Sequence, residues 1–118
     1  MTYRTYNGYF YLASPYSSVD ADVREERYHK VMCHSANLLK KGIIAYSPIV
    51  YSHEMSKKFE MPSDADFWWF FNKIMLDKCD VLMVYKMQDW DKSKGVKQEI
   101  DYALENDIPI VYCEEEKT

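Results

Sequence analysis

The sequence lacks the features that mark several common classes of protein. Neither G-x-G-x-x-G nor G-x-x-x-x-G-K occurs, so the fingerprints of dinucleotide and nucleoside-triphosphate binding are missing. The three cysteines form no C-x-x-C motif and no Cys/His pairing at zinc spacing, so we expect reduced thiols and no metal site. No apolar run approaches the roughly 18 residues that a membrane span needs. No basic cluster appears and the net charge is −4, which argues against sequence-independent binding of nucleic acids.

What is present indicates a globular chain. Hydrophobic residues make up 47% and charged residues 29% of its 118 residues, which suits a single domain over residues 1–118. Residues 1–7 are polar and predict a short tail, and no signal-peptide pattern follows, so we expect a cytoplasmic protein. A small anionic metabolite is compatible with the acidic charge, because local N–H donors can hold a phosphate.

Apolar strands alternate with amphipathic helices along the chain. The segment Ile49–Glu54 reads as a loop or a short helix, and residues 55–63 read as a polar surface excursion. The order predicts an α/β domain with a doubly wound, open parallel sheet of about four strands. Pro109, early in the last strand, predicts an edge position for that strand. The expected strands are Tyr9–Ala13, Ile43–Ser47, Asp80–Tyr85 and Ile108–Tyr112, and the expected helices cover 19–41, 65–79 and 93–106.

Ligands of such sheets bind at the carboxyl ends of the strands, near the switch in strand order. Three expected loops meet there, Ser14–Ser18, Ser47–His53 and Met87–Gly95. Ser14 and Ser17 flank Pro15 and Tyr16 in a constrained turn, and their hydroxyls suit a ribose or a phosphate, although ordinary turn chemistry also explains them. His53 is either a donor to a base or phosphate, or a structural histidine.

The stretch from Ser93 to Glu99 carries the strongest chemical signal. Ser93 is suited to cap a helix, and Gly95 leaves room for another group near the free N–H groups of the first turn. With the positive end of the helix dipole this makes a cradle for a phosphate. At 100° per residue, Val96 and Glu99 fall on the packing face, so the carboxylate points inward and can act as a nucleophile or a general base. The alternative is a capped helix with one border glutamate.

The expected helix at 65–79 is apolar nearly all round. Such a helix is covered on more than one side, and in a domain this small a second subunit is the expected cover, so we expect a homodimer or higher homo-oligomer. Its aromatic run, Trp68–Phe71, is expected to serve the core or the interface rather than to stack on a base.

Four landmarks together resemble a known family. They are Tyr11-Leu-Ala-Ser-Pro-Tyr-Ser17, Ser47-Pro48, Asp80, and Ser93-x-Gly95-Val96-x-x-Glu99. Over roughly residues 9–112 the chain resembles the nucleoside 2-deoxyribosyltransferase superfamily, which includes the deoxynucleoside monophosphate N-glycosidases. It is most similar to a small branch of that superfamily found in bacteria and phages.

The resemblance implies a flavodoxin-like fold, a homo-oligomer whose sites a neighbouring subunit completes, and no metal or organic cofactor. Glu99 matches the family's catalytic glutamate, which attacks the anomeric carbon of the deoxyribose. Ser93 matches the phosphate-binding serine of the monophosphate hydrolases, so a 5′-phosphorylated nucleoside is the expected substrate. Gly95, Val96 and the Ser14–Ser17 loop are expected to bind the substrate with it.

Asn72 departs from the family pattern, in which an aspartate often stands eight residues before the aspartate that opens the third strand. Asparagine can hydrogen-bond a base but cannot exchange a proton at neutral pH. Two alternatives therefore stand beside an N-glycosidase or deoxyribosyltransferase-like enzyme. One is a module that binds a nucleotide for sensing or sequestration without cleaving it, and the other is a structural subunit built around the aromatic helix.

Overall fold

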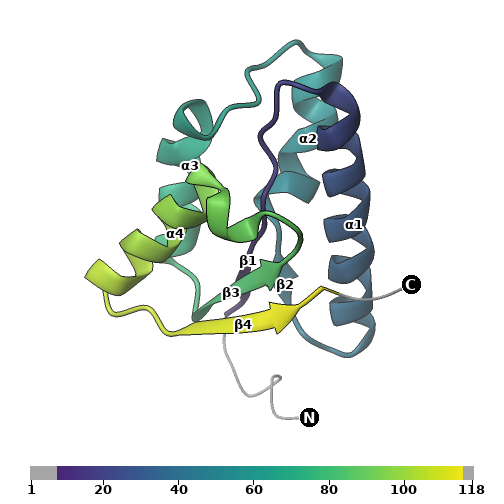
Figure 1. The fold of residues 1–118 in the computed structure, drawn as a ribbon. Helices are drawn as coiled ribbons and strands as arrows, with labels where there is room; N and C mark the ends of the chain where they lie inside the picture. Colours follow the sequence, from purple (N-terminus) through teal and green to yellow (C-terminus); the bar gives the residue numbers. More distant parts are fainter. Residues whose placement is uncertain (1–7, 116–118) are drawn as a thin grey trace.

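The fold, seen in a computed structural model that describes residues 8–115, is an α/β flavodoxin-like domain (Figure 1). Four strands alternate with four α-helices and one short 3-10 helix, η2. The tail expected at residues 1–7 lies outside the described residues. The elements are β1 (Phe10–Ala13), α1 (Ala21–Lys40), β2 (Ala45–Tyr46), α2 (Pro48–Lys58), α3 (Ala65–Asp77), β3 (Val81–Lys86), η2 (Trp90–Lys92), α4 (Lys94–Glu105) and β4 (Ile110–Glu114).

All strand pairs in the sheet are parallel, and the order is β2-β1-β3-β4. β1 is therefore central, and the order reverses between β1 and β3, which makes this the switch point of the sheet. The predicted edge position of the last strand is confirmed, since among residues 8–115 β4 pairs with β3 alone. The loops after β1 and β3 consequently leave the sheet side by side.

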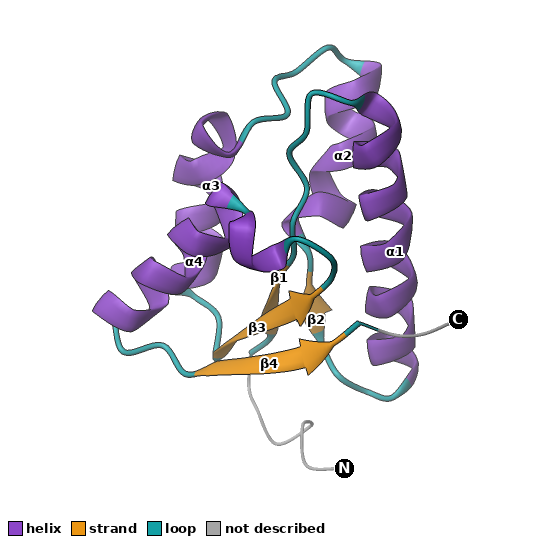
Figure 2. Ribbon diagram, in the orientation of Figure 1, coloured by secondary structure: helices purple, strands orange, loops and turns teal. Residues whose placement is uncertain are grey.

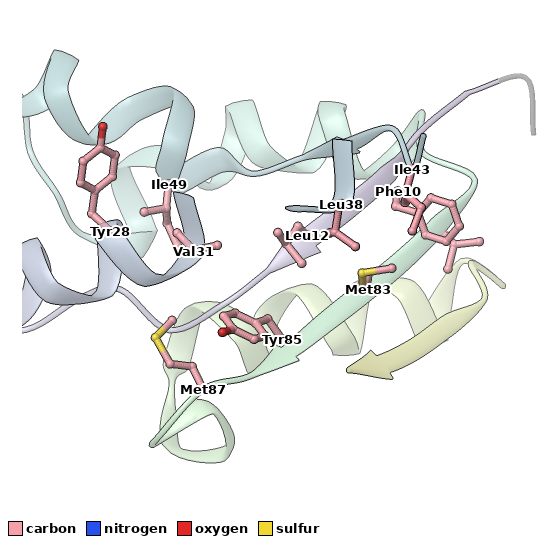
Figure 3. Close-up of a cluster of buried hydrophobic side chains, with 11 residues drawn as sticks. Phe10, Leu12, Tyr28, Val31, Leu38, Ile43, Ile49, Met83, Tyr85 and Met87 are labelled. Atoms are coloured by element: carbon pink, nitrogen blue, oxygen red, sulfur yellow. The ribbon is translucent and has the colours of Figure 1, made fainter. Parts of the chain in front are cut away.

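Two layers of helices cover the two faces of the sheet, α1 and α2 on one face and α3 and α4 on the other (Figures 1 and 2). Because side chains alternate along a strand, β1 sends Phe10 and Leu12 to the α1/α2 layer and Tyr11 and Ala13 to the α3/α4 layer. Figure 3 shows the first of these cores, in which Leu12 faces aliphatic side chains of α1 and α2. Tyr11 is thereby directed toward α4.

Local signals explain where the helices begin and end. Asp20, Ser47, Asp64 and Ser93 cap the four α-helices with side-chain oxygens that accept from backbone N–H groups of the first turn. Gly42 follows α1 with a φ of 84°, a left-handed conformation that glycine adopts without strain. The predicted cap at Ser93 is therefore confirmed.

The segment after β2 differs in part from the prediction. Residues 48–58 form an 11-residue helix, α2, so the helical alternative for Ile49–Glu54 is confirmed, but the helix continues to Lys58 into the stretch that was expected to be a polar surface excursion. The extent of the helix was not predicted because its inner side carries the polar residues Ser52, His53 and Ser56, where apolar residues would be expected. Pro48 stands at the first helical turn, where its missing N–H costs nothing.

Within the described part of the chain, no helix combines the length and the hydropathy needed to cross a bilayer.

Candidate functional site

A cleft of about 530 Å³, partly open to solvent, lies at the carboxyl ends of the strands. The loop after β1 rises between the two helical layers at this end of the sheet (Figure 2). The lining comes from that loop, from α2, from the start of α3 and from the start of α4, and comprises Ser14, Tyr16, Ser17, Pro48, Ile49, Ser52, Ser56, Ser63, Asp64, Ala65, Trp68, Asn72, Ser93, Gly95 and Glu99.

Glu99 lies one turn inside α4 and is only 6% exposed, so the predicted inward direction of its carboxylate is confirmed. Its Oε2 atom accepts a hydrogen bond of 2.5 Å from the Tyr11 hydroxyl. No other hydrogen bond to this carboxylate is formed by residues 8–115, and Glu99 also lines the cleft. Tyr11 therefore fixes one oxygen, and the other is available to a ligand.

Burial shapes the chemistry of this carboxylate. Desolvation raises the pKa of Glu99 to about 8, and the hydrogen bond from Tyr11 opposes that rise. Desolvation and the adjacent carboxylate in turn raise the pKa of Tyr11, which keeps its phenol protonated as the donor. A group that ionises near neutral pH in a cleft is suited to nucleophilic or general-base chemistry.

The start of α4 carries the groups on which the prediction of an anion cradle rests. The Ser93 Oγ atom accepts from the N–H of Val96 at 3.2 Å, and its own O–H is free to donate toward the cleft. The N–H of Gly95 has no partner within the helix, because the first N–H groups of any helix lack one. A Cβ atom at Gly95 would lie 3.6 Å from the Cβ atom of Ala65, which is ordinary van der Waals contact. The protein itself therefore tolerates a side chain here, and the glycine leaves space in the cleft.

Neutral donors dominate the lining. Six serines contribute hydroxyl groups, whereas Asp64 and Glu99 are the acidic residues and no lysine or arginine belongs to the lining that the structure describes. The cation nearest in sequence to the cradle, Lys94, forms an ion pair with Asp66 at 3.0 Å. A phosphate here would be held by hydroxyls, backbone N–H groups and the helix dipole.

Two buried polar atoms in the cleft lining lack partners within residues 8–115. One is the Oδ1 atom of Asn72 on α3, and the other is the Oγ atom of Ser14, whose side chain is 6% exposed. A buried polar group without a hydrogen bond costs roughly 1–3 kcal/mol, which a bound ligand can recover. The structure thus brings Asn72 and Ser14 to the same cleft as Glu99.

The sequence reasoning missed several lining residues. Trp68 was expected in the core or an interface, but it lines the cleft and its Nε1–H donates to the carbonyl of Pro62 at 2.8 Å. Ser52 and Ser56 were missed because a helix that continues past Glu54 was not predicted, and their i, i+4 spacing on that helix would have placed them on one face. Tyr11 was noted only as part of a motif. The alternation of side chains along β1, which directs Tyr11 toward α4, was the signal that could have identified it.

Three of the predicted site residues do not line the cleft. Val96 is 1% exposed and packs in the core beneath α4, where only its N–H reaches the Ser93 hydroxyl. Pro15 is fully buried below the turn. His53 lies on α2 rather than in a loop, is 3% exposed, and hydrogen-bonds Tyr16 and Glu25 instead of facing the cleft. These three shape the site from behind.

One group of side chains has the composition of a metal site. Ligand atoms of Glu25, His53 and Glu54 lie within 4.8 Å of one another. The Lys57 ammonium, however, is 3.0 Å from Glu25 Oε1 and 3.9 Å from Glu54 Oε2, so a positive charge already lies between the carboxylates. This arrangement disfavours a cation there.

Comparison with known proteins identifies a family without assigning an activity. A family model described as a domain of unknown function, DUF1937, matches residues 8–115. No curated protein matches the chain.

Proposed function

The chain belongs to the DUF1937 family, and we propose that it is a nucleotide N-glycosidase or deoxyribosyltransferase-like enzyme that acts on a deoxynucleoside 5′-monophosphate. The resemblance to the nucleoside 2-deoxyribosyltransferase superfamily supports this proposal, and so does the cleft. In this assignment Glu99 is the nucleophile, Ser93 and Gly95 hold the phosphate, and Asn72 contacts the base.

One observation carries the proposal. A buried carboxylate with one oxygen fixed by Tyr11 lies a single helical turn behind a phosphate-sized cradle. The sugar of a nucleoside monophosphate lies between its phosphate and its base. A ligand with its phosphate at Ser93 and its base near Trp68 and Asn72 therefore presents its sugar to Glu99, since all four residues line the same cleft.

The chemistry requires little beyond these groups. The Glu99 carboxylate attacks the anomeric carbon and the bond to the base breaks, which gives a glycosyl-enzyme that water or a second base then resolves with retention. Enclosure by the protein strengthens the attraction between the carboxylate and the positive charge that develops on the sugar. The Tyr11 hydrogen bond favours the ionised form that attack requires.

Asn72 favours one competing function, a module that binds nucleotides without cleaving them. An amide cannot supply the proton that an aspartate would. Such a module would show a raised melting temperature with nucleotides and no release of free base. A purely structural subunit would respond to no nucleotide.

We also propose that a second copy of the chain covers α3. Leu76 is the only buried residue of that helix, while Phe67, Phe70 and Ile74 are 39%, 70% and 57% exposed. Tyr51 of α2, 49% exposed, stacks on Phe71 and extends this apolar surface. An apolar surface of this kind marks a contact between proteins, and α3 also lines the cleft, so a second copy would cover one wall of the site.

The test is incubation with a panel of deoxynucleoside monophosphates, with free base measured by chromatography. We expect the wild-type protein to release base from at least one of them and Glu99→Ala to release none. Equal inertness of both proteins across the panel, together with nucleotide-dependent stabilisation, would favour the binding module.

A further inference from the structure

Behind the cleft, three side chains form a row of hydrogen bonds that the function proposed above does not use. The Tyr16 hydroxyl lies 2.7 Å from His53 Nδ1, and His53 Nε2 lies 3.1 Å from Glu25 Oε1. Tyr16 comes from the loop after β1, His53 from α2 and Glu25 from α1. Three separate elements therefore converge on one buried imidazole.

The chemistry of Glu25 fixes the direction of one of these bonds. Hydrogen bonds from Lys57 and then from His53 lower the pKa of Glu25, which keeps that group a carboxylate that can only accept. His53 Nε2 must then carry a proton and donate it. When the imidazole is neutral, Nδ1 is an acceptor and the Tyr16 hydroxyl donates to it.

The imidazole is also held rigidly. His53 is 3% exposed, and its ring stacks on Tyr28 with centroids 4.0 Å apart and planes 18° apart. Lys57 is 3.0 Å from the same Glu25 oxygen that His53 contacts. A carboxylate, an imidazole and a hydroxyl in a fixed row are the arrangement by which proteins move protons to and from a reacting group.

Tyr16 connects this row with the cleft. It lines the cleft, and it also lines a second cavity of about 480 Å³ that includes Arg24, His53 and Lys57. That second cavity gives the row a route for exchange of protons with solvent.

The reaction proposed for the cleft requires a proton donor for the leaving base. A base leaves more easily when it is protonated, and Asn72 cannot give a proton. Asp64 is occupied in capping α3, where it accepts from the N–H of Phe67 at 3.2 Å. Glu99 is assigned to the attack on the sugar. Tyr16 also lines the cleft, and its hydroxyl is hydrogen-bonded to His53, which can supply it with a proton.

We propose that Tyr16 is a catalytic residue that protonates the leaving base, and that His53 and Glu25 are positioning residues that resupply its proton. This inference rests on the proposed function, because it concerns the leaving group of the same reaction.

The proton balance closes over one turnover. In the starting state His53 is an imidazolium that donates from Nε2 to Glu25 and from Nδ1 to the Tyr16 oxygen. As the bond from the sugar to the base breaks, its electron pair goes to the base nitrogen, which takes the Tyr16 proton, and the Nδ1 proton moves to the Tyr16 oxygen. Water then attacks the glycosyl-enzyme and releases the Glu99 carboxylate. The proton that this water loses goes to the Tyr16 oxygen, and the Tyr16 proton returns to Nδ1.

The pH dependence of this step has identifiable contributors. The titratable and charged groups that face His53 and its two partners come from the β1 loop, α1 and α2, and they are Tyr16, Arg24, Glu25, Tyr28, His29, Glu54 and Lys57. His29 contacts the other oxygen of Glu25, with Nε2 3.3 Å from Oε2, but it has no contact with Tyr16. It therefore offers a matched control.

The experiment compares two substrates that differ in their need for a proton. One is the deoxynucleoside monophosphate that the wild-type protein cleaves, and the other is a 2-deoxyribose 5-phosphate with p-nitrophenolate at the anomeric carbon, which leaves without protonation. For Tyr16→Phe and His53→Gln, we expect the ratio of nucleotide to nitrophenyl turnover to fall by about 10²- to 10⁴-fold, the usual range for general acid catalysis. His29→Gln should keep the wild-type ratio.

The pH profile supplies a readout that a structural role would not change. With the nucleotide, wild-type kcat should fall at high pH, where the row from Tyr16 to Glu25 no longer supplies a proton, and this fall should be absent with the nitrophenyl substrate and in His53→Gln. If Tyr16→Phe and His53→Gln lose turnover equally on both substrates, or lose it on neither, the proton route is overturned. In that case turnover by the wild-type protein would still support the proposed function. If the wild-type protein cleaves neither substrate, the proposed function fails and this inference fails with it.

Discussion

The Tyr11 hydroxyl donates a hydrogen bond of 2.5 Å to Glu99 Oε2 across 88 positions of the sequence. This bond joins β1 to α4, the helix of the proposed phosphate cradle, at the point where the strand order reverses. Both side chains are buried, and the contact opposes the rise in the pKa of Glu99 that burial causes. The pair therefore links the packing of the sheet to the ionisation of the proposed nucleophile.

Tyr11→Phe should move the pH dependence of catalysis to higher pH. The Tyr11 hydrogen bond stabilises the carboxylate, so its removal raises the pKa of Glu99 above about 8. The rate of base release at pH 7 should fall, and the rising limb of the pH profile should shift upward. Steady-state kinetics between pH 6 and pH 10 measure this shift.

Tyr46→Phe is the matched control for that experiment. Tyr46 packs edge-to-face on Tyr11 with ring centroids 5.7 Å apart, and its buried hydroxyl has no partner within residues 8–115. Its loss should leave the rising limb where it is. Equal shifts in the two variants would mean that general packing, not the hydrogen bond, sets the pKa of Glu99.

Glu99→Gln should increase stability at alkaline pH. Between the ordinary pKa of 4.5 and the folded value of about 8, the native state holds a proton that the unfolded chain has lost. The free energy of unfolding therefore falls as pH rises through this window, by an amount on the order of a few kcal/mol. Glutamine is neutral and can still accept from Tyr11. Melting temperatures should differ little at pH 4.5 and favour the variant at pH 9, and a variant that is less stable at pH 9 would contradict this.

Gly95→Ala should weaken phosphate binding without harming the fold. The added Cβ atom makes only ordinary contact with Ala65, and alanine favours a helix over glycine by up to about 1 kcal/mol. The melting temperature should stay the same or rise, while the affinity for a nucleoside monophosphate should fall about tenfold or more, which is about 1.4 kcal/mol. Calorimetric titration measures both proteins, and Lys94→Ala, with an exposed side chain outside the cleft, is the control.

Phe70→Lys together with Ile74→Lys should convert an oligomer into a monomer. Both side chains project from the exposed apolar side of α3, and a charge there opposes burial. Analytical ultracentrifugation should find the wild-type protein as a dimer or larger. Phe59→Lys, which changes a 74% exposed phenyl group at the end of α2, should keep the wild-type mass. A monomeric wild-type protein would end the oligomer proposal.

Much of the fold could be predicted because its signals are local. Alternating apolar strands and helices give the parallel sheet, Pro109 gives the edge strand, and Ser93 and Gly42 give helix ends. The full extent of α2 could not be predicted in this way, although a short helix was one of two expectations for Ile49–Glu54. Its inner residues Ser52 and Ser56 face a cleft, so the apolar periodicity that reveals a helix is missing there.

The same physical reason limits prediction of the site. The direction of Glu99 follows from helical spacing, because it shares a face with core residues. Its contact with Tyr11 and the row from Tyr16 to Glu25 depend on how distant elements pack, and no local pattern encodes a separation of 88 or 37 residues. The partners in such long-range polar contacts can therefore be identified only once the packing of the elements is known.

The central claim is that Glu99 forms a covalent bond with the sugar. The most direct measurement is the mass of the protein after rapid acid quenching of its reaction with the deoxynucleoside monophosphate that it cleaves best. We predict an added deoxyribose 5-phosphate group on the peptide that contains Glu99, together with free base, and neither product from Glu99→Gln. Release of base at the wild-type rate by Glu99→Gln, or an adduct on another residue, would contradict the account.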